Sequence, residues 1–128
     1  LGRLAPRQPP AAFAGQTCAG ELLYAPHSHF DLYGHFVPAF CGGLSLGSWR
    51  EFGRLRAEYQ AGQFPRLIGL LIRAGPYGLC TMAQEAYGYA PPADGFVDKC
   101  HLCVDVRRHL ARVGDFPALQ PAEFYEHF

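Results

Sequence analysis

The chain has 128 residues, which is the size of one domain with its own core. Hydrophobic residues make up 49% of it and aromatic residues 14%, enough for a packed interior, while fifteen glycines and eleven prolines predict many turns. Eleven basic and eleven acidic residues cancel, so charge gives no reason to expect binding to nucleic acid or to an anionic membrane.

No apolar run reaches transmembrane length, and no signal peptide is recognisable. The five cysteines are an odd number, which favours metal-binding thiols in the cytoplasm over a framework of disulfides. The chain starts at Leu1 rather than Met, so we expect a processed, trimmed or excised product. Residues 1–128 are predicted to form a single domain.

The first part of the chain predicts a small β-structure. Residues 1–15 contain three prolines and are expected to be an irregular lead-in. Residues 21–25 are a short strand candidate. Residues 29–32 and 35–40 are predicted strands joined by a tight turn, and together they form a β-hairpin. Residues 42–47 are rich in glycine and predict a flexible turn.

Helices are predicted for most of the rest. Ser48 can cap a helix over residues 49–61, with Glu51 at the capping-box position. A second helix is expected over 65–74 and a third over 76–87, separated by Gly75. Two more are expected over 100–113 and from Pro121 onward. The predicted fold is therefore α+β, a small β-hairpin followed by a cluster of four to five helices.

The most informative motif is a C-x-x-C at the start of the predicted helix over 100–113. Cys100 and Cys103 are three residues apart, so they share one helical face and can bind one metal centre. The partial positive charge of the helix N-terminus also favours thiolates there. Two ligands do not complete a site, so further ligands are needed.

Two other cysteines are placed to join them. Cys18 precedes the first strand candidate and Cys41 closes the hairpin, and a hairpin brings its two ends together. Four thiolates from three segments predict either a tetrahedral zinc site or a [4Fe–4S] site, and spacing alone does not choose between these. The alternative is that Cys18 and Cys41 are ordinary buried residues. Cys80, inside a predicted helix, is expected to be a core residue.

Several residues are candidates for the surroundings of the metal. Arg107 follows Cys103 by four residues and can donate hydrogen bonds to sulfur, unless it is a solvated surface side chain. His29 and His35 flank the hairpin turn, and His101 lies between the paired thiols. Each could replace a thiol on zinc, although surface or core-edge histidines are the simpler interpretation. No Ser/His/Asp arrangement, phosphate-binding glycine loop or close carboxylate pair has supporting context.

The order of these motifs resembles a known family. The run His29-Phe30-Asp31-Leu32-Tyr33-Gly34-His35, the following Cys41, and the glycines from Gly42 to Gly47 resemble the C-terminal extension of radical S-adenosylmethionine proteins. Gly75-Pro76, Gly88-Tyr89, and Lys99-Cys100-His101-Leu102-Cys103 with Arg107 follow in the same order, and Leu1-Gly2-Arg3 is similar to the segment that leaves the last barrel strand.

The resemblance implies an auxiliary domain of the SPASM or twitch type, which holds a [4Fe–4S] cluster. The implied ligands are Cys18, Cys41, Cys100 and Cys103. The cluster would relay electrons, anchor a substrate or close the mouth of the barrel. The C-x-x-x-C-x-x-C that cleaves S-adenosylmethionine is absent from this sequence. The chain is therefore expected not to be catalytic alone, and S-adenosylmethionine would bind only to the full-length enzyme.

The expected partner is the barrel of such an enzyme, in cis or in trans, with a peptide or protein as a candidate substrate. Nucleic acid and membrane are not expected partners. Two other functions remain open from the residues themselves. One is a structural zinc module that binds a protein, and the other is a metal-free helical binding domain whose cysteines are all reduced.

Overall fold

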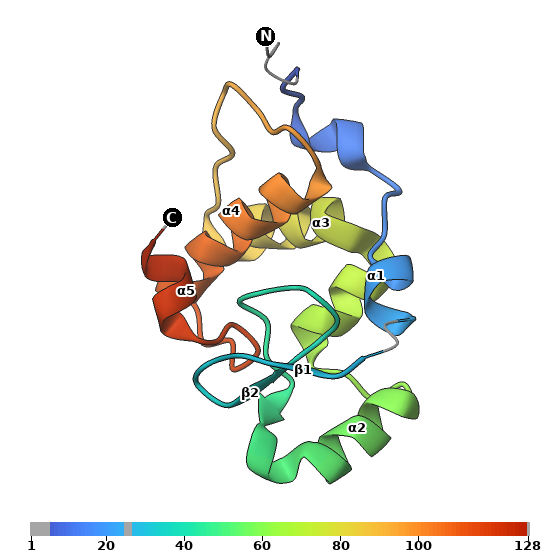
Figure 1. Cartoon of the computed structure of the whole chain (residues 1–128). Coiled ribbons are helices and arrows are strands. Elements are labelled where there is room, and N and C mark those ends of the chain that lie inside the picture. Colours follow the sequence, from blue (N-terminus) through green and yellow to red (C-terminus); the bar gives the residue numbers. More distant parts are fainter. Residues whose placement is uncertain (1–5, 25–26, 128) are drawn as a thin grey trace, which may run out of the picture.

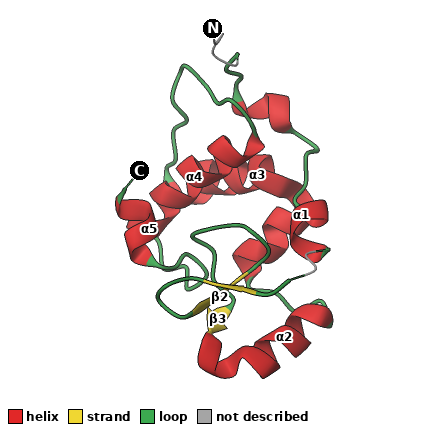
Figure 2. Ribbon diagram, in the orientation of Figure 1, coloured by secondary structure: helices red, strands yellow, loops and turns green. Residues whose placement is uncertain are grey.

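Two long helices, α3 and α4, pack side by side, and η1, α1 and α5 pack against one or the other of them (Figure 1). Helix α2 packs instead against η2 and β3. The computed structural model describes residues 6–24 and 27–127. The elements are the 3₁₀ helix η1 (Pro10–Phe13), α1 (Ala19–Leu23), β1 (His29–Phe30), β2 (His35–Val37), β3 (Gly47–Ser48), the 3₁₀ helix η2 (Trp49–Glu51), α2 (Phe52–Gln60), α3 (Arg66–Tyr87), α4 (Lys99–Val113) and α5 (Ala122–Glu126). The predicted α+β class is confirmed, since a small antiparallel sheet accompanies five α-helices (Figure 2).

The hairpin is confirmed, but its strands are shorter than predicted. β1 pairs with β2 in antiparallel register, with Phe30 opposite Phe36. The carboxylate of Asp31 ends β1, because it accepts hydrogen bonds from the backbone N–H groups of Tyr33 and His35 at 2.8 and 2.9 Å. Pro38 has no N–H to donate and follows the last residue of β2.

Residues 42–46 form the predicted turn, and a third strand begins at its last predicted residue, Gly47. β3 pairs with β2 on the side away from β1, with Gly47 opposite Phe36. The side chain of Ser48 caps the following turn by accepting from the N–H of Arg50 at 3.2 Å, as predicted. Glu51 does not complete the capping box. It pairs instead with Arg54 at 2.8 Å, and α2 begins one residue later.

The strand predicted over residues 21–25 is wrong, because this segment begins as helix α1. Its helical turn places Leu22 in the core, fully buried, and the N–H of Leu22 donates to the carbonyl of Cys18 at 2.9 Å. Residue 25 lies outside the described residues. Residues 6–15 of the predicted lead-in are irregular apart from η1, but they are anchored, while residues 1–5 lie outside the described residues. Gln8 and Phe96 exchange two backbone hydrogen bonds of 2.8 Å each.

The predicted second and third helices are the two halves of α3, joined across a kink. Gly75 has φ 71° and ψ −172° at the junction, and Pro76 follows it. Glycine is needed because this backbone region is closed to other residues. The carbonyl of Leu71, one turn before the kink, accepts from the backbone N–H of Cys18 at 3.0 Å. This contact with α3 positions a candidate ligand.

Helix α4 begins where the sequence predicts. Asp98 caps it, with its carboxylate accepting from the N–H of His101 at 2.8 Å. One face of α4 is buried against the core, and it consists of Leu102, Cys103, Val106, Arg107 and Leu110. Within the described ranges, no helix combines the length and apolarity required to cross a membrane.

Replacing the kink glycine should have a large effect. A Cβ at Gly75 would collide with the carbonyl of Gln16 and lie 2.9 Å from the Cα of Thr17. Gly75→Ala should therefore lower the free energy of unfolding by about 3 kcal/mol. Gly53→Ala is the matched control, because Gly53 is helical with open space around it, and it should raise stability by about 0.5–1 kcal/mol. Urea denaturation measures both, and effects of the same sign would contradict this account.

Candidate metal centre

The segments that carry the four predicted cysteines meet near the first turns of α4. The thiol of Cys18 interacts electrostatically with those of Cys103 and Cys41. The thiol of Cys41 interacts with those of Cys103 and Cys100, and the last two interact with each other. Cys18 comes from the N-terminal end of α1, Cys41 from the loop after β2, and the other two from α4. The four predicted cysteines are therefore within electrostatic range of one another, and we call them the thiol group.

All four cysteines of the thiol group are free thiols and form no disulfides. In residues 6–24 and 27–127, no set of three or more His, Cys, Asp or Glu side chains is arranged to hold a metal ion. Tetrahedral zinc requires every sulfur at about 2.3 Å from the ion, so a metal could bind here only after these side chains rearranged.

Burial raises the pKa of three of the four thiols in the metal-free chain. It raises the pKa of Cys18 to about 12, an effect that Cys103 reinforces and Lys99 opposes. Burial also raises the pKa of Cys41, against the opposing charge of Arg107, and that of Cys100, with help from Asp98. A metal that binds here must displace these protons, so its affinity rises with pH.

A lysine lies on the Cys18 and Cys100 side of the thiol group. The Nζ atom of Lys99 donates to the carbonyl of Thr17 at 2.9 Å and to the carboxylate of Glu21 at 2.5 Å. Burial alone would lower its pKa, but the interactions with Glu21, Cys18 and Cys100 raise it. Lys99 is therefore a retained positive charge beside two of the thiols, although Glu21 partly neutralises it.

An arginine lies on the Cys41 and Cys103 side. Arg107 is only 4% exposed, and its Nη1 atom donates to the carbonyl of Gly42 at 2.9 Å and to the hydroxyl of Tyr125 at 2.8 Å. Burial would lower its pKa, but interaction with Cys103 and Tyr125 raises it instead. The predicted sharing of one helical face with Cys103 is confirmed, and the alternative of a solvated surface arginine is wrong.

Arg107 has no carboxylate partner among the residues that the structure describes. Its Nε atom is buried and has no acceptor there. A guanidinium group in such a position is normally paired, because burying an uncompensated charge is costly. The anionic forms of Cys103 and Cys41 are the groups placed to compensate it.

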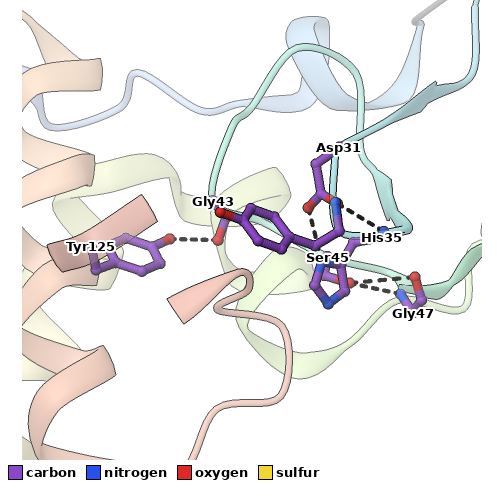
Figure 3. A network of polar contacts seen from close by, with 7 residues as sticks. Asp31, His35, Gly43, Ser45, Gly47 and Tyr125 are labelled. Atoms are coloured by element: carbon purple, nitrogen blue, oxygen red, sulfur yellow. Dashed lines mark hydrogen bonds and ion pairs between the residues drawn. The ribbon is translucent and has the colours of Figure 1, made fainter. Parts of the chain in front are cut away.

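Tyr125 is a structural partner of the site that sequence reasoning missed. Its hydroxyl accepts from Arg107 and donates to the carbonyl of Gly43 at 2.5 Å, so α5 is fastened to the loop that carries Cys41 (Figure 3). Gly43 has φ 82°, and a Cβ there would collide with Phe124. No local motif marks Tyr125, because its two partners are far away in sequence.

The three candidate histidines make their described contacts outside the thiol group. His35 pairs through Nδ1 with Asp31 at 2.8 Å (Figure 3), and the ring of His29 lies 4.4 Å from that of Phe40. His101 accepts through Nδ1 from the N–H of Val97 at 3.1 Å. Hydrogen bonds from His35 and Tyr33 hold the pKa of Asp31 below its usual value, against the effect of burial.

Cys80 is separate from the thiol group. It is fully buried in α3, and its thiol donates to the side-chain oxygen of Gln84 on the same helix at 3.7 Å. The expectation that Cys80 is a core residue is confirmed. It therefore provides a matched control for substitutions of the other four cysteines.

Protein-family models, curated proteins and solved structures were compared with the chain, and none matches it. The chemistry of the site is therefore inferred from its own residues.

Removal of the Tyr125 hydroxyl should destabilise the fold. Tyr125→Phe leaves the buried carbonyl of Gly43 without this donor and Arg107 without this acceptor, so the free energy of unfolding should fall by about 1–2 kcal/mol. Tyr24→Phe is the control, because Tyr24 is 77% exposed, and it should change stability by less than about 0.5 kcal/mol. Equal losses of unfolding free energy in the two variants, measured by urea denaturation, would show that the Tyr125 hydroxyl does not stabilise the fold.

Alkaline pH should destabilise the metal-free chain through Cys18. Its pKa is 9.0 when unfolded and about 12 when folded, so its contribution to stability is complete below pH 9 and is lost as the pH rises toward 12. The free energy of unfolding should fall by at most about 1.4 kcal/mol per pH unit from this group. Cys18→Ala should show a shallower decline between pH 8.5 and 10.5, measured by denaturation at each pH. If the unfolding free energy of Cys18→Ala fell with pH as steeply as that of the wild-type chain, Cys18 would not be the cause of the decline.

Proposed function

We propose that this chain is an auxiliary [4Fe–4S] cluster-binding domain of a radical S-adenosylmethionine enzyme, with Cys18, Cys41, Cys100 and Cys103 as the cluster ligands. The observation that carries the proposal is Arg107, a buried cation that lacks a carboxylate partner in the described structure and faces the thiol group. Its orphaned Nε atom is a donor available to sulfur.

The charges around the thiol group support a metal–thiolate centre. Four thiolates around an iron–sulfur core or a zinc ion leave a net negative charge. Arg107 offsets that charge beside Cys41 and Cys103, and Lys99 offsets it beside Cys18 and Cys100. In a permanently metal-free chain with protonated thiols, the buried guanidinium would have no anion to balance it.

The sequence motifs, rather than the geometry, favour a cluster over a single zinc ion, because Cys18, Cys41, Cys100 and Cys103 follow the order that resembles the auxiliary-cluster domains. Structural zinc, which uses the same ligands, is the alternative that metal analysis distinguishes. When bound, the cluster supplies one-electron transfer.

The domain would act beside a catalytic barrel, in cis or in trans. The exposed side of the hairpin and its surroundings offers a surface for that contact, because large apolar side chains gather there. They are Phe30, Leu32, Tyr33, Phe40 and Trp49. Cys100 is exposed, so an edge of the centre could face the barrel or a bound peptide or protein. Electron relay, substrate anchoring and closure of the barrel mouth all fit this position.

Anaerobic reconstitution with iron and sulfide tests the ligand set. The wild-type chain should bind about four irons and four sulfides, with broad absorbance near roughly 400 nm. Alanine at Cys18, Cys41, Cys100 or Cys103 should sharply reduce the iron content, because each substitution removes one ligand. Cys80→Ala should retain it, because Cys80 belongs to the core of α3. Iron and sulfide assays provide the measurement.

Two outcomes would overturn parts of this proposal. Full iron incorporation by the Cys100→Ala variant would exclude that residue from the ligand set. Stoichiometric zinc without sulfide, in protein prepared anaerobically, would establish the zinc module instead.

A further inference from the structure

A cavity of about 360 Å³ lies between α1, β2 and α2, and its size is that of a small-molecule site. Apolar side chains form about half of its lining, among them Leu22, Phe36, Val37, Leu46 and Phe64. The polar residues of the lining are His27, Ser28, Arg56, Tyr59 and Gln60. A cavity with both kinds of surface fits a ligand that has an apolar body and a polar end.

The charged residues that line the cavity indicate which polar group the ligand should carry. Arg56 makes no ion pair or hydrogen bond with any residue in the described ranges, and its only described partner is the ring of Phe52, 6.0 Å away. By contrast, Arg54 on the same helix is held between Glu51 at 2.8 Å and Glu58 at 2.7 Å. None of the described residues that line the cavity is Asp or Glu. The cavity therefore offers an unpaired guanidinium group to an anion, with no competing carboxylate.

The cavity is next to the thiol group. Ala39, in its wall, is two residues before Cys41, and Leu22 follows Cys18 by one helical turn. Tyr59 also lines the cavity, and its hydroxyl donates to the carbonyl of Leu22. Burial, together with the neighbouring Cys41, raises the pKa of Tyr59 to about 12.

The backbone of the shared wall is strained. Ala39 has φ 51°, in the left-handed region that residues other than glycine rarely occupy. Such conformations persist only where the surrounding structure enforces them, and they cluster at functional sites. At Ala39 the enforced turn shapes the cavity wall and leads directly to the loop of Cys41.

We propose that this cavity binds a small organic carboxylate, with its carboxylate on Arg56 and its apolar body against Phe36 and Phe64. The aromatic side chains favour a ligand with a flat ring. A carboxylate suits Arg56 because the planar guanidinium can bind both of its oxygens. The inference depends on the lining alone and does not require the metal centre. If that centre is loaded, the ligand lies beside it.

The test uses 3-phenylpropionate as the probe and 3-phenylpropanol, which has no charge, as its comparator. Titration of the chain, followed by calorimetry and by amide NMR shifts, should give saturable binding of the carboxylate. Arg56→Gln should weaken that binding at least about tenfold, because a charge-assisted bidentate contact is lost. Arg50→Gln is the matched control. Arg50 is also exposed, but it stacks on Trp49 and lies outside the cavity, so its loss should change affinity by less than about twofold.

Three results would overturn the proposal. These are absence of binding to the wild-type chain, equal affinity in the Arg56→Gln variant, and binding of the alcohol as tight as that of the carboxylate. Amide NMR shifts confined to residues outside the cavity would count as absence of binding to the cavity. Iron content measured on the same Arg56→Gln protein keeps the two hypotheses separate, because Arg56 is not a predicted ligand and its loss should leave reconstitution intact.

Discussion

The buried guanidinium group of Arg107 is the constraint on which the site depends. Burial of a charge is tolerated only when hydrogen bonds and counter-charges replace water. Arg107 donates hydrogen bonds to the carbonyl of Gly42 and to the hydroxyl of Tyr125, and thereby holds the Cys41 loop and α5 against α4. The thiol of Cys103 is placed to provide the counter-charge once it is ionised. One side chain therefore links the stability of the C-terminal segment to the chemistry of the thiols.

The rest of the thiol group is positioned by breaks in regular structure. The carbonyl of Leu71, one turn before the kink at Gly75, anchors the backbone of Cys18, and the turns after β2 carry Cys41. The cap by Asp98 sets the first turn of α4, and with it Cys100 and Cys103. A metal centre assembled this way needs the folded chain, since its ligands come from three separate segments.

The cavity beside Arg56 and the thiol group are close together in the fold. The segment through Ala39 to Cys41 borders both, and α1 contributes Leu22 to one and follows Cys18 of the other. The exposed aromatic side chains of the hairpin region are a separate feature, suited to contact with a larger partner.

The sequence by itself determined the hairpin, the helices of the second half and the C-x-x-C face of α4, because turn residues, caps and apolar spacing act locally. It misassigned residues 21–25, where burial of Leu22 against the core selects a helix that short-range pattern does not reveal. It also could not show β3, the contacts of Tyr125 or the cavity beside Arg56. Only the tertiary structure decided those, because strand pairing, the burial of Arg107 beside Tyr125, and the cavity around Arg56 arise from contacts between segments distant in the chain.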